Sequence, residues 1–127
     1  MPDSPLRYEL RDGVALLQLD DGKANVISPP VVDAFHAALD RAADEATAVV
    51  LAGRAGRFSA GFDLATFREG PAATPDLVRA GARLALRLYG YPHPVVAACS
   101  GHAIAMGAIL LLSCDVRIGA VGPFQVG

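Results

Sequence analysis

The sequence is short of positive charge, and above all of lysine. Its basic residues number 11, of which Lys23 is the single lysine, and the arginines are scattered along the chain. No basic stripe is interleaved with aromatic residues, and the formal net charge is −2. Nucleic acids and anionic membrane surfaces are bound mainly through clustered lysine and arginine. We therefore expect neither of them as a partner.

Cysteine is scarce as well, with Cys99 and Cys114 the 2 present. They form no CxxC pair and have no zinc-ligand spacing, so the sequence predicts buried free thiols in a reducing compartment and no bound metal. The first residues, MPDSPLRYEL, lack the basic start and apolar run of a secretory signal. Together these absences predict a cytoplasmic protein.

Charged residues make up 19% of the chain and hydrophobic residues 53%. This is enough apolar material for the core of one domain, and it suggests extra apolar surface to be covered by another subunit or segment. Within the most apolar stretch, Pro94–Ala120, the segment 95–114 has roughly the length of a membrane helix. Ser100–His102 interrupts it and charged residues follow it, so we expect two buried elements in place of a membrane span.

Periodicity places strands and helices alternately along the chain. Residues 8–12 and 14–20 flank Asp12-Gly13 and predict a hairpin. Ser28 should cap a helix that begins with Pro29 and Pro30. The apolar stripe expected on that helix comprises Val31, Val32, Phe35, Ala38, Leu39 and Ala42. Further strands are expected at 48–52, 95–99 and 115–120, further helices at 76–89 and 103–114, and loops at 53–57 and 69–75.

The helix expected at 76–89 carries two rows of side chains. Its buried row is Leu77, Ala80, Leu84 and Leu88, and its other row is Arg79, Arg83 and Arg87. The arginine row could meet phosphates, but we favour a solvated helix face. The pattern as a whole predicts an α/β domain with a largely parallel sheet. Because residues 124–127 end without a polar tail, we expect a domain, 1–127, that is incomplete at its C-terminus.

Three segments of the chain resemble the crotonase family, also called the enoyl-CoA hydratase/isomerase family. Residues 57–64, RFSAGFDL, are similar to its F-S/C/A-A-G-x-D-L pattern. Residues 94–118, PVVAACSGHAIAMGAILLLSCDVRI, are similar to its P-V/I-A-A-V-x-G-x-A-x-G-G-G…CD-x-R-I/V pattern, and VALLQLDDGKANVIS resembles its opening hairpin. The resemblance implies the repeated ββα spiral of the ClpP/crotonase fold, truncated before its C-terminal part.

Family members bind an acyl-CoA thioester and stabilise an enolate-type oxyanion with two backbone N–H groups. Matched by position, the resemblance implies that these donors are the N–H groups of Phe62 and Met106. It also implies coenzyme A contacts, with CoA as part of the substrate and no separate cofactor, at Lys23, Ala24, Ala60, Asp63 and Leu64. A solvated turn lysine is an equal interpretation of Lys23. The family further implies a homo-oligomer, a trimer or a pair of trimers.

The departures from the family pattern bear on the reaction. Ile109 stands where hydratases place their first catalytic glutamate, and isoleucine can neither activate water nor deliver a proton. We therefore favour isomerase-like proton transfer over hydration. A non-catalytic acyl-CoA-binding or assembly protein, and an inactive fragment, are the alternatives. The sequence does not choose among Asp63, Glu69, Asp115 and His102 as an acid or base, although turn, cap or loop roles suit them.

Overall fold

The computed structural model describes residues 4–127, so the first three residues of the expected domain lie outside the described part. Its largest sheet has five strands. In spatial order its strands are β1 (Leu6–Arg11), β2 (Val14–Leu19), β4 (Ala48–Ala52), β7 (Val95–Cys99) and β9 (Val116–Gly119). Strand β1 is antiparallel to β2, and all other neighbours are parallel. The largely parallel α/β sheet expected from the sequence is confirmed.

Two short parallel ladders stand apart from this sheet. One pairs β3 (Val26–Ile27) with β6 (Gly61–Phe62), and the other pairs β5 (Gly56–Ser59) with β8 (Gly101–Ala103). Strands β3, β5 and β8 each come directly after a strand of the main sheet. A helix follows β3 and β8, and the chain after β5 passes through β6 before its helix. The chain therefore repeats the order of main strand, short strand and helix, which is the ββα repeat that the resemblance implies.

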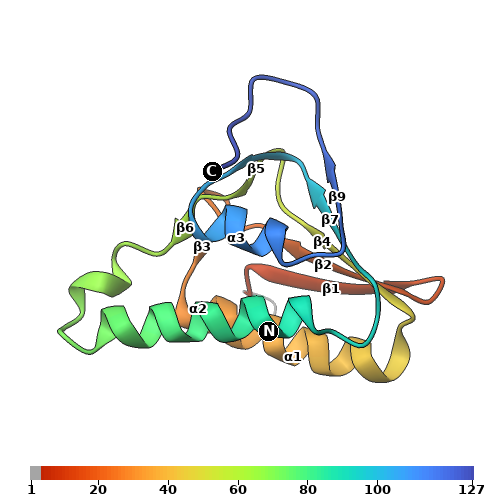
Figure 1. Ribbon diagram of the computed structural model, residues 1–127, viewed down its shortest axis with the longest axis horizontal. Coiled ribbons are helices and arrows are strands. Elements are labelled where there is room, and N and C mark those ends of the chain that lie inside the picture. The colour runs from red at the N-terminus through yellow and green to blue at the C-terminus, as the bar shows by residue number, and fades with distance from the viewer. Residues whose placement is uncertain (1–3) are drawn as a thin grey trace.

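Helices α1 (Pro29–Glu45) and α2 (Ala73–Tyr89) contact each other and run side by side, with the main sheet above them (Figure 1). The short helix α3 (Met106–Leu112) contacts α2 and both short ladders. A one-turn 3-10 helix, η1 (Thr66–Arg68), precedes α2. Side chains of the main sheet that face the helices, such as Leu17, Val49 and Ala97, are fully buried and form the core.

Local sequence signals account well for the first half of the chain. Asp12 and Gly13 both have positive φ, 51° and 80°, which is what a tight two-residue hairpin turn requires. The Ser28 side chain accepts a hydrogen bond from Val31 N, so it caps α1 as expected. The six residues expected to form the apolar stripe of α1 are all buried.

Between residues 53 and 114 the structure differs from expectation at four places. The helix expected at 103–114 is shorter, because Ala103 pairs with Ser59 in the β5–β8 ladder and α3 begins only at Met106. Helix α2 begins at Ala73, inside the expected loop 69–75, and residues 56–57 of the expected loop 53–57 belong to β5. The buried row of α2 contains Gly81 in place of the expected Ala80, which is only half-buried. Within residues 4–127 no helix has the length and apolar character needed to span a bilayer.

Candidate functional site

The two backbone donors expected from the sequence lie next to each other. Phe62 ends β6, and Met106 is the first residue of α3. They meet across Gly61, where an added Cβ atom would lie 3.3 Å from Met106 N and 3.0 Å from the carbonyl oxygen of Ile104. Only a residue without a side chain fits there with φ at +97°. The glycine therefore allows β6 and the start of α3 to touch at the two donor positions.

The orientation of both N–H groups follows from their neighbours. Asp63 N donates to the carbonyl oxygen of Ile27 over 2.9 Å, and successive N–H groups of a strand point to opposite edges. The N–H of Phe62 therefore points away from β3. Met106 N, as the first of a helix, has no intrahelical acceptor, and no hydrogen bond from it occurs among residues 4–127. Neither N–H group therefore has an acceptor among the described residues.

The residues expected to contact coenzyme A lie at the two ends of the β3–β6 ladder: Lys23, Ala24 and Ala60 precede it, and Asp63 and Leu64 follow it. Ala60 N donates to the carbonyl oxygen of Ala24 over 3.0 Å, so these two residues are direct neighbours. Lys23 precedes them, with an exposed side chain and a backbone carbonyl that accepts from Arg54. Leu64 is also exposed. Asp63 is occupied locally, since its carboxylate accepts from Thr66 Oγ1 over 2.8 Å and from Ala65 N over 3.3 Å.

The loop that presents Lys23 and Ala24 is braced by Asp21 and Asn25, whose roles the sequence did not indicate. The Asp21 carboxylate accepts from the backbone N–H groups of Lys23, Asn25 and Val26 at 2.7–3.0 Å. Asn25 is fully buried at φ 57°, and its Nδ2 donates to the carbonyl oxygen of Leu19 over 2.7 Å. A signal that could have predicted these roles is the spacing of Asp21 and Asn25, four residues apart in a polar turn, because Asp and Asn side chains often bond to nearby backbone groups.

The ionisation of Asp21 is shifted by this bracing. Burial by itself raises the pKa of the carboxyl, but the N–H groups of Asn25, Lys23 and Val26 and the charge of Arg54 outweigh it. The pKa of Asp21 is therefore lower than its ordinary value. The loop beside Lys23 is held by an ionised carboxylate at neutral pH.

The groups considered as an acid or base are placed as follows. Ile109 lies one helical turn after Met106 and is 47% exposed, so its face of α3 is open. Asp115 accepts from Val95 N over 2.7 Å, beyond the far end of α3. Glu69 follows η1 and is exposed. His102 lies in β8, not in a turn, and its Nδ1 accepts from Gln125 N over 3.0 Å.

Both cysteines are buried free thiols, as expected. Cys99 Sγ donates to the carbonyl oxygen of Gly101, and Cys114 Sγ to that of Leu110. Burial raises the pKa of Cys114 to about 12. The Cys114 thiol therefore does not have the character of a nucleophile at neutral pH.

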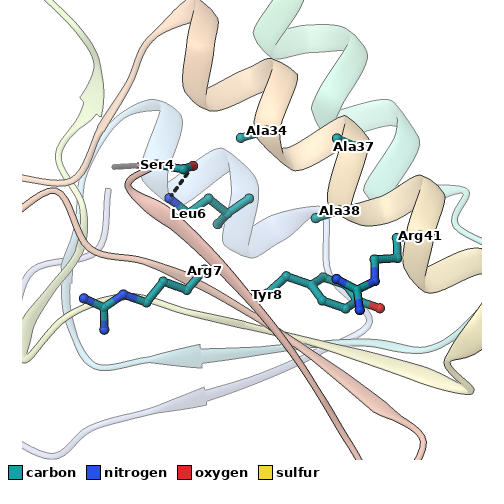
Figure 2. Close-up of a pocket in the computed structure, with 8 residues that line it drawn as sticks. All are labelled: Ser4, Leu6, Arg7, Tyr8, Ala34, Ala37, Ala38 and Arg41. Atoms are coloured by element: carbon teal, nitrogen blue, oxygen red, sulfur yellow. Dashed lines mark hydrogen bonds between the residues drawn. The ribbon is translucent and has the colours of Figure 1, made fainter. Parts of the chain in front are cut away.

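A groove of about 700 Å³ lies elsewhere, between β1 and α1 (Figure 2). Ala34, Ala37 and Ala38 of α1 form one side of it, and Tyr8 and Arg41 stack at one end with 4.2 Å between the guanidinium carbon and the ring centroid. None of the residues expected at the donor site or the coenzyme A contacts lines this groove.

The comparison with known families decides the classification. A family model described as Enoyl-CoA hydratase/isomerase matches residues 9–123. The chain belongs to the enoyl-CoA hydratase/isomerase family. A probable enoyl-CoA hydratase of Rhodobacter capsulatus is 37% identical over 117 residues, which cover 91% of this chain and 46% of that protein.

Solved structures of the family agree with the fold. A family member from Pseudomonas syringae has a TM-score of 0.92 and 48% identity, covering 94% of this chain and 52% of that one. An enoyl-CoA isomerase of Mycobacterium tuberculosis has a TM-score of 0.84 and 45% identity, covering 92% and 51%. The expected crotonase-like α/β fold is confirmed. The chain spans about half the length of these relatives.

Proposed function

We propose that this chain binds an acyl-CoA thioester and stabilises the enolate oxyanion formed at its carbonyl oxygen with the N–H groups of Phe62 and Met106. The observation that carries the proposal is the contact at Gly61, which brings the start of α3 against β6 with the Met106 N–H free of an acceptor among the described residues. Removing a proton next to a thioester carbonyl moves negative charge onto the carbonyl oxygen. Two preorganised donors stabilise that charge, and losing one typically costs about 10²–10³ in rate.

The coenzyme A moiety would extend from the donors along β6 towards the loop at Lys23. Ala24 and Ala60 are neighbours through their backbone hydrogen bond, and their small side chains leave room for a ligand. Lys23 supplies the positive charge for a phosphate. Asp63 and Leu64 follow β6, with Leu64 exposed and Asp63 holding the turn.

Isomerisation suits these residues better than hydration. Moving a double bond requires one base that takes a proton from carbon 2 of the acyl group and returns it to carbon 4, while the enolate oxygen holds the charge in between. Hydration also requires activation of water, and Ile109 cannot provide it. The names of solved relatives do not separate the two reactions, because one Mycobacterium tuberculosis protein with 45% identity is named a probable enoyl-CoA hydratase in one structure and an enoyl-CoA isomerase in another. The proposed proton-transferring carboxylate is not assigned to a residue of this chain.

A non-catalytic acyl-CoA-binding or assembly role is the second candidate. The exposed, apolar Ile109 favours it, because an isoleucine beside the donors offers a contact and no chemistry. In keeping with assembly, α3 and β9 expose Leu112, Val116 and Ile118 as well. We accordingly propose that the working form is a cytoplasmic homo-oligomer.

Titration calorimetry with crotonyl-CoA, acetyl-CoA and free CoA tests the binding proposal, alongside a thermal melt followed by circular dichroism. The informative variant is Gly61→Ala, whose Cβ would press against Met106 N and Ile104 O. Gly119→Ala is its control, since nothing lies within 4 Å of that position. We expect micromolar binding of the thioesters that Gly61→Ala weakens more than it weakens binding of free CoA. A cooperative melt without any binding would contradict the proposal.

Mass spectrometry of the products separates the candidate reactions. Hydration adds water to crotonyl-CoA, whereas isomerisation of a 3-enoyl-CoA leaves its mass unchanged and shifts its retention time. We expect the second outcome for an enzyme of this kind. Binding without turnover of either substrate would favour the non-catalytic candidate.

A further inference from the structure

Gly81 lies in the middle of α2 at the point where the side chains of both proposed donor residues meet the helix. A Cβ atom at Gly81 would lie 2.5 Å from Cζ and 2.6 Å from Cε1 of Phe62, and 3.2 Å from Cε of Met106. Two residues that are 44 positions apart in sequence (62 and 106) therefore share one small surface of α2. Gly81 itself is buried.

The need for glycine here comes from space and not from backbone conformation. Gly81 is helical, and its φ is not in the left-handed region. Glycine in the interior of a helix is destabilising relative to alanine, because its backbone loses more freedom on folding. The side chain that α2 forgoes would occupy the position of the Phe62 ring. Gly81 therefore lowers the stability of α2 and at the same time leaves the space that the Phe62 ring and the Met106 methyl group occupy.

The contact constrains the backbone of both donors. In a strand the side chain stands perpendicular to the plane in which the N–H group lies, so a shift of the Phe62 ring rotates the direction of its N–H. The ring is held from a second side by Phe67, at 5.8 Å between centroids and 69° between ring planes. Met106 is buried against the same helix surface. Phe67 lies on one side of the ring and α2 on another, so the part of a displacement at Gly81 that side-chain rotation does not absorb passes into the Phe62 and Met106 backbones.

We propose that Gly81 is a positioning residue, which seats the Phe62 ring and the Met106 side chain on α2 and so sets the relative direction of their two N–H groups. This inference rests on the proposed function for its catalytic meaning. Its geometric content, that one helix position couples two distant amides, holds for the chain without any ligand.

Gly81→Ala tests the inference, with three companions. Phe62→Leu shortens the side chain that the new Cβ would strike, and it is made alone and together with Gly81→Ala. Ala82→Leu adds volume at the exposed neighbouring position of α2 and serves as the control. The added Cβ meets the outer end of a ring and a flexible methyl group, so we expect Gly81→Ala to fold.

Two readouts are taken on each protein. The first is the position of the Phe62 and Met106 amide resonances in ¹H–¹⁵N spectra. The second is the ratio of affinities for acetoacetyl-CoA, whose enolate places charge on the thioester oxygen, and for free CoA. We expect Gly81→Ala to shift both amides and to lower the ratio about tenfold, part of the 10²–10³ that a lost donor costs. The double variant should recover the ratio, and Ala82→Leu should change neither readout.

The inference is overturned if Gly81→Ala leaves both amides in place, or if it lowers the affinities for the two ligands equally with a lower melting temperature. If the unaltered protein binds neither ligand, the proposed function fails. The amide shifts then decide the positioning role by themselves: coupled shifts support it, and their absence contradicts it.

Discussion

The hydroxyl of Ser59 donates to the carbonyl oxygen of Asn25 over 2.7 Å and accepts from the backbone N–H of Gly61 over 3.1 Å. Ser59 is 1% exposed and Asn25 is fully buried. A single side chain therefore joins the loop of Lys23 and Ala24 to the strand that leads into Phe62. This buried group adds to the β3–β6 ladder and to the hydrogen bond from Ala60 N to Ala24 O in holding the two parts of the proposed site together.

Ser59→Ala should destabilise the fold by about 1–3 kcal/mol, because the carbonyl of Asn25 and the N–H of Gly61 would both be left buried without a partner. Urea unfolding followed by circular dichroism measures the change. Thr47→Ala is the control, since it removes an exposed hydroxyl that bonds to the carbonyl oxygen of Gly13. We expect the control to lose clearly less. Equal losses in the two variants would show that the burial of Ser59 adds nothing.

Asp21 should make the stability of the protein depend on acid pH. Its pKa is lowered in the folded chain, so its contribution is fully present above the ordinary value of 3.8 and is lost as the pH falls through the lowered native value. Asp21→Asn should therefore reduce stability at neutral pH and flatten its decline on acidification. Unfolding free energies measured from neutral pH down to acid check this, with the exposed Asp33→Asn as control. Parallel pH profiles for the unaltered protein and Asp21→Asn would contradict the role given to this carboxylate.

Gly107→Ala should be among the most damaging small substitutions in the chain. The added Cβ would lie 2.4 Å from the carbonyl oxygen and 3.0 Å from the carbonyl carbon of Ser59, which are backbone atoms that cannot rotate away. Overpacking of this kind costs about 1–3 kcal/mol or more. Gly119→Ala has open space around its Cβ and should be neutral or slightly stabilising. Thermal melts of the two variants make the comparison, and a neutral Gly107→Ala would show that α3 can move away from β5.

Signals carried by neighbouring residues were sufficient for much of the fold. The Asp12-Gly13 turn, the Ser28 cap and the buried stripe of α1 each depend on residues within a few positions of one another. The predicted start of α3 was wrong because residues 103–105 suit a strand and a helix alike. Their pairing with Ser59, more than 40 positions away, decides between them.

The residues of the candidate site also fall into those that a sequence pattern indicated and those that only distant contacts explain. The family pattern pointed to Phe62 and Met106, and the structure brings them together through Gly61. No local pattern distinguishes Gly81 from an ordinary helix glycine, because its reason lies in a ring from residue 62 and a methyl group from residue 106. The sequence showed Asn25 only as a member of the opening motif. Its structural role was not predictable, because its side-chain amide donates to the carbonyl oxygens of Arg57 and Phe58, more than 30 positions away. Contacts of this range cannot be read from periodicity.

Ala105 offers a last test, because it holds a strained conformation immediately before the proposed donor Met106. Its φ of 51° and ψ of −116° lie in a region that costs a residue with a side chain about 1–3 kcal/mol. Its N–H donates to the carbonyl oxygen of Gly127, and its own carbonyl accepts from Ile109 N, so the backbone is fixed from both sides. Ala105→Gly should therefore raise the free energy of unfolding by about 1 kcal/mol. Ala37→Gly, at an exposed position inside α1, should lower it by about the same amount. Chemical denaturation measures both, and a loss of stability in both variants would mean that residue 105 carries no strain for glycine to relieve.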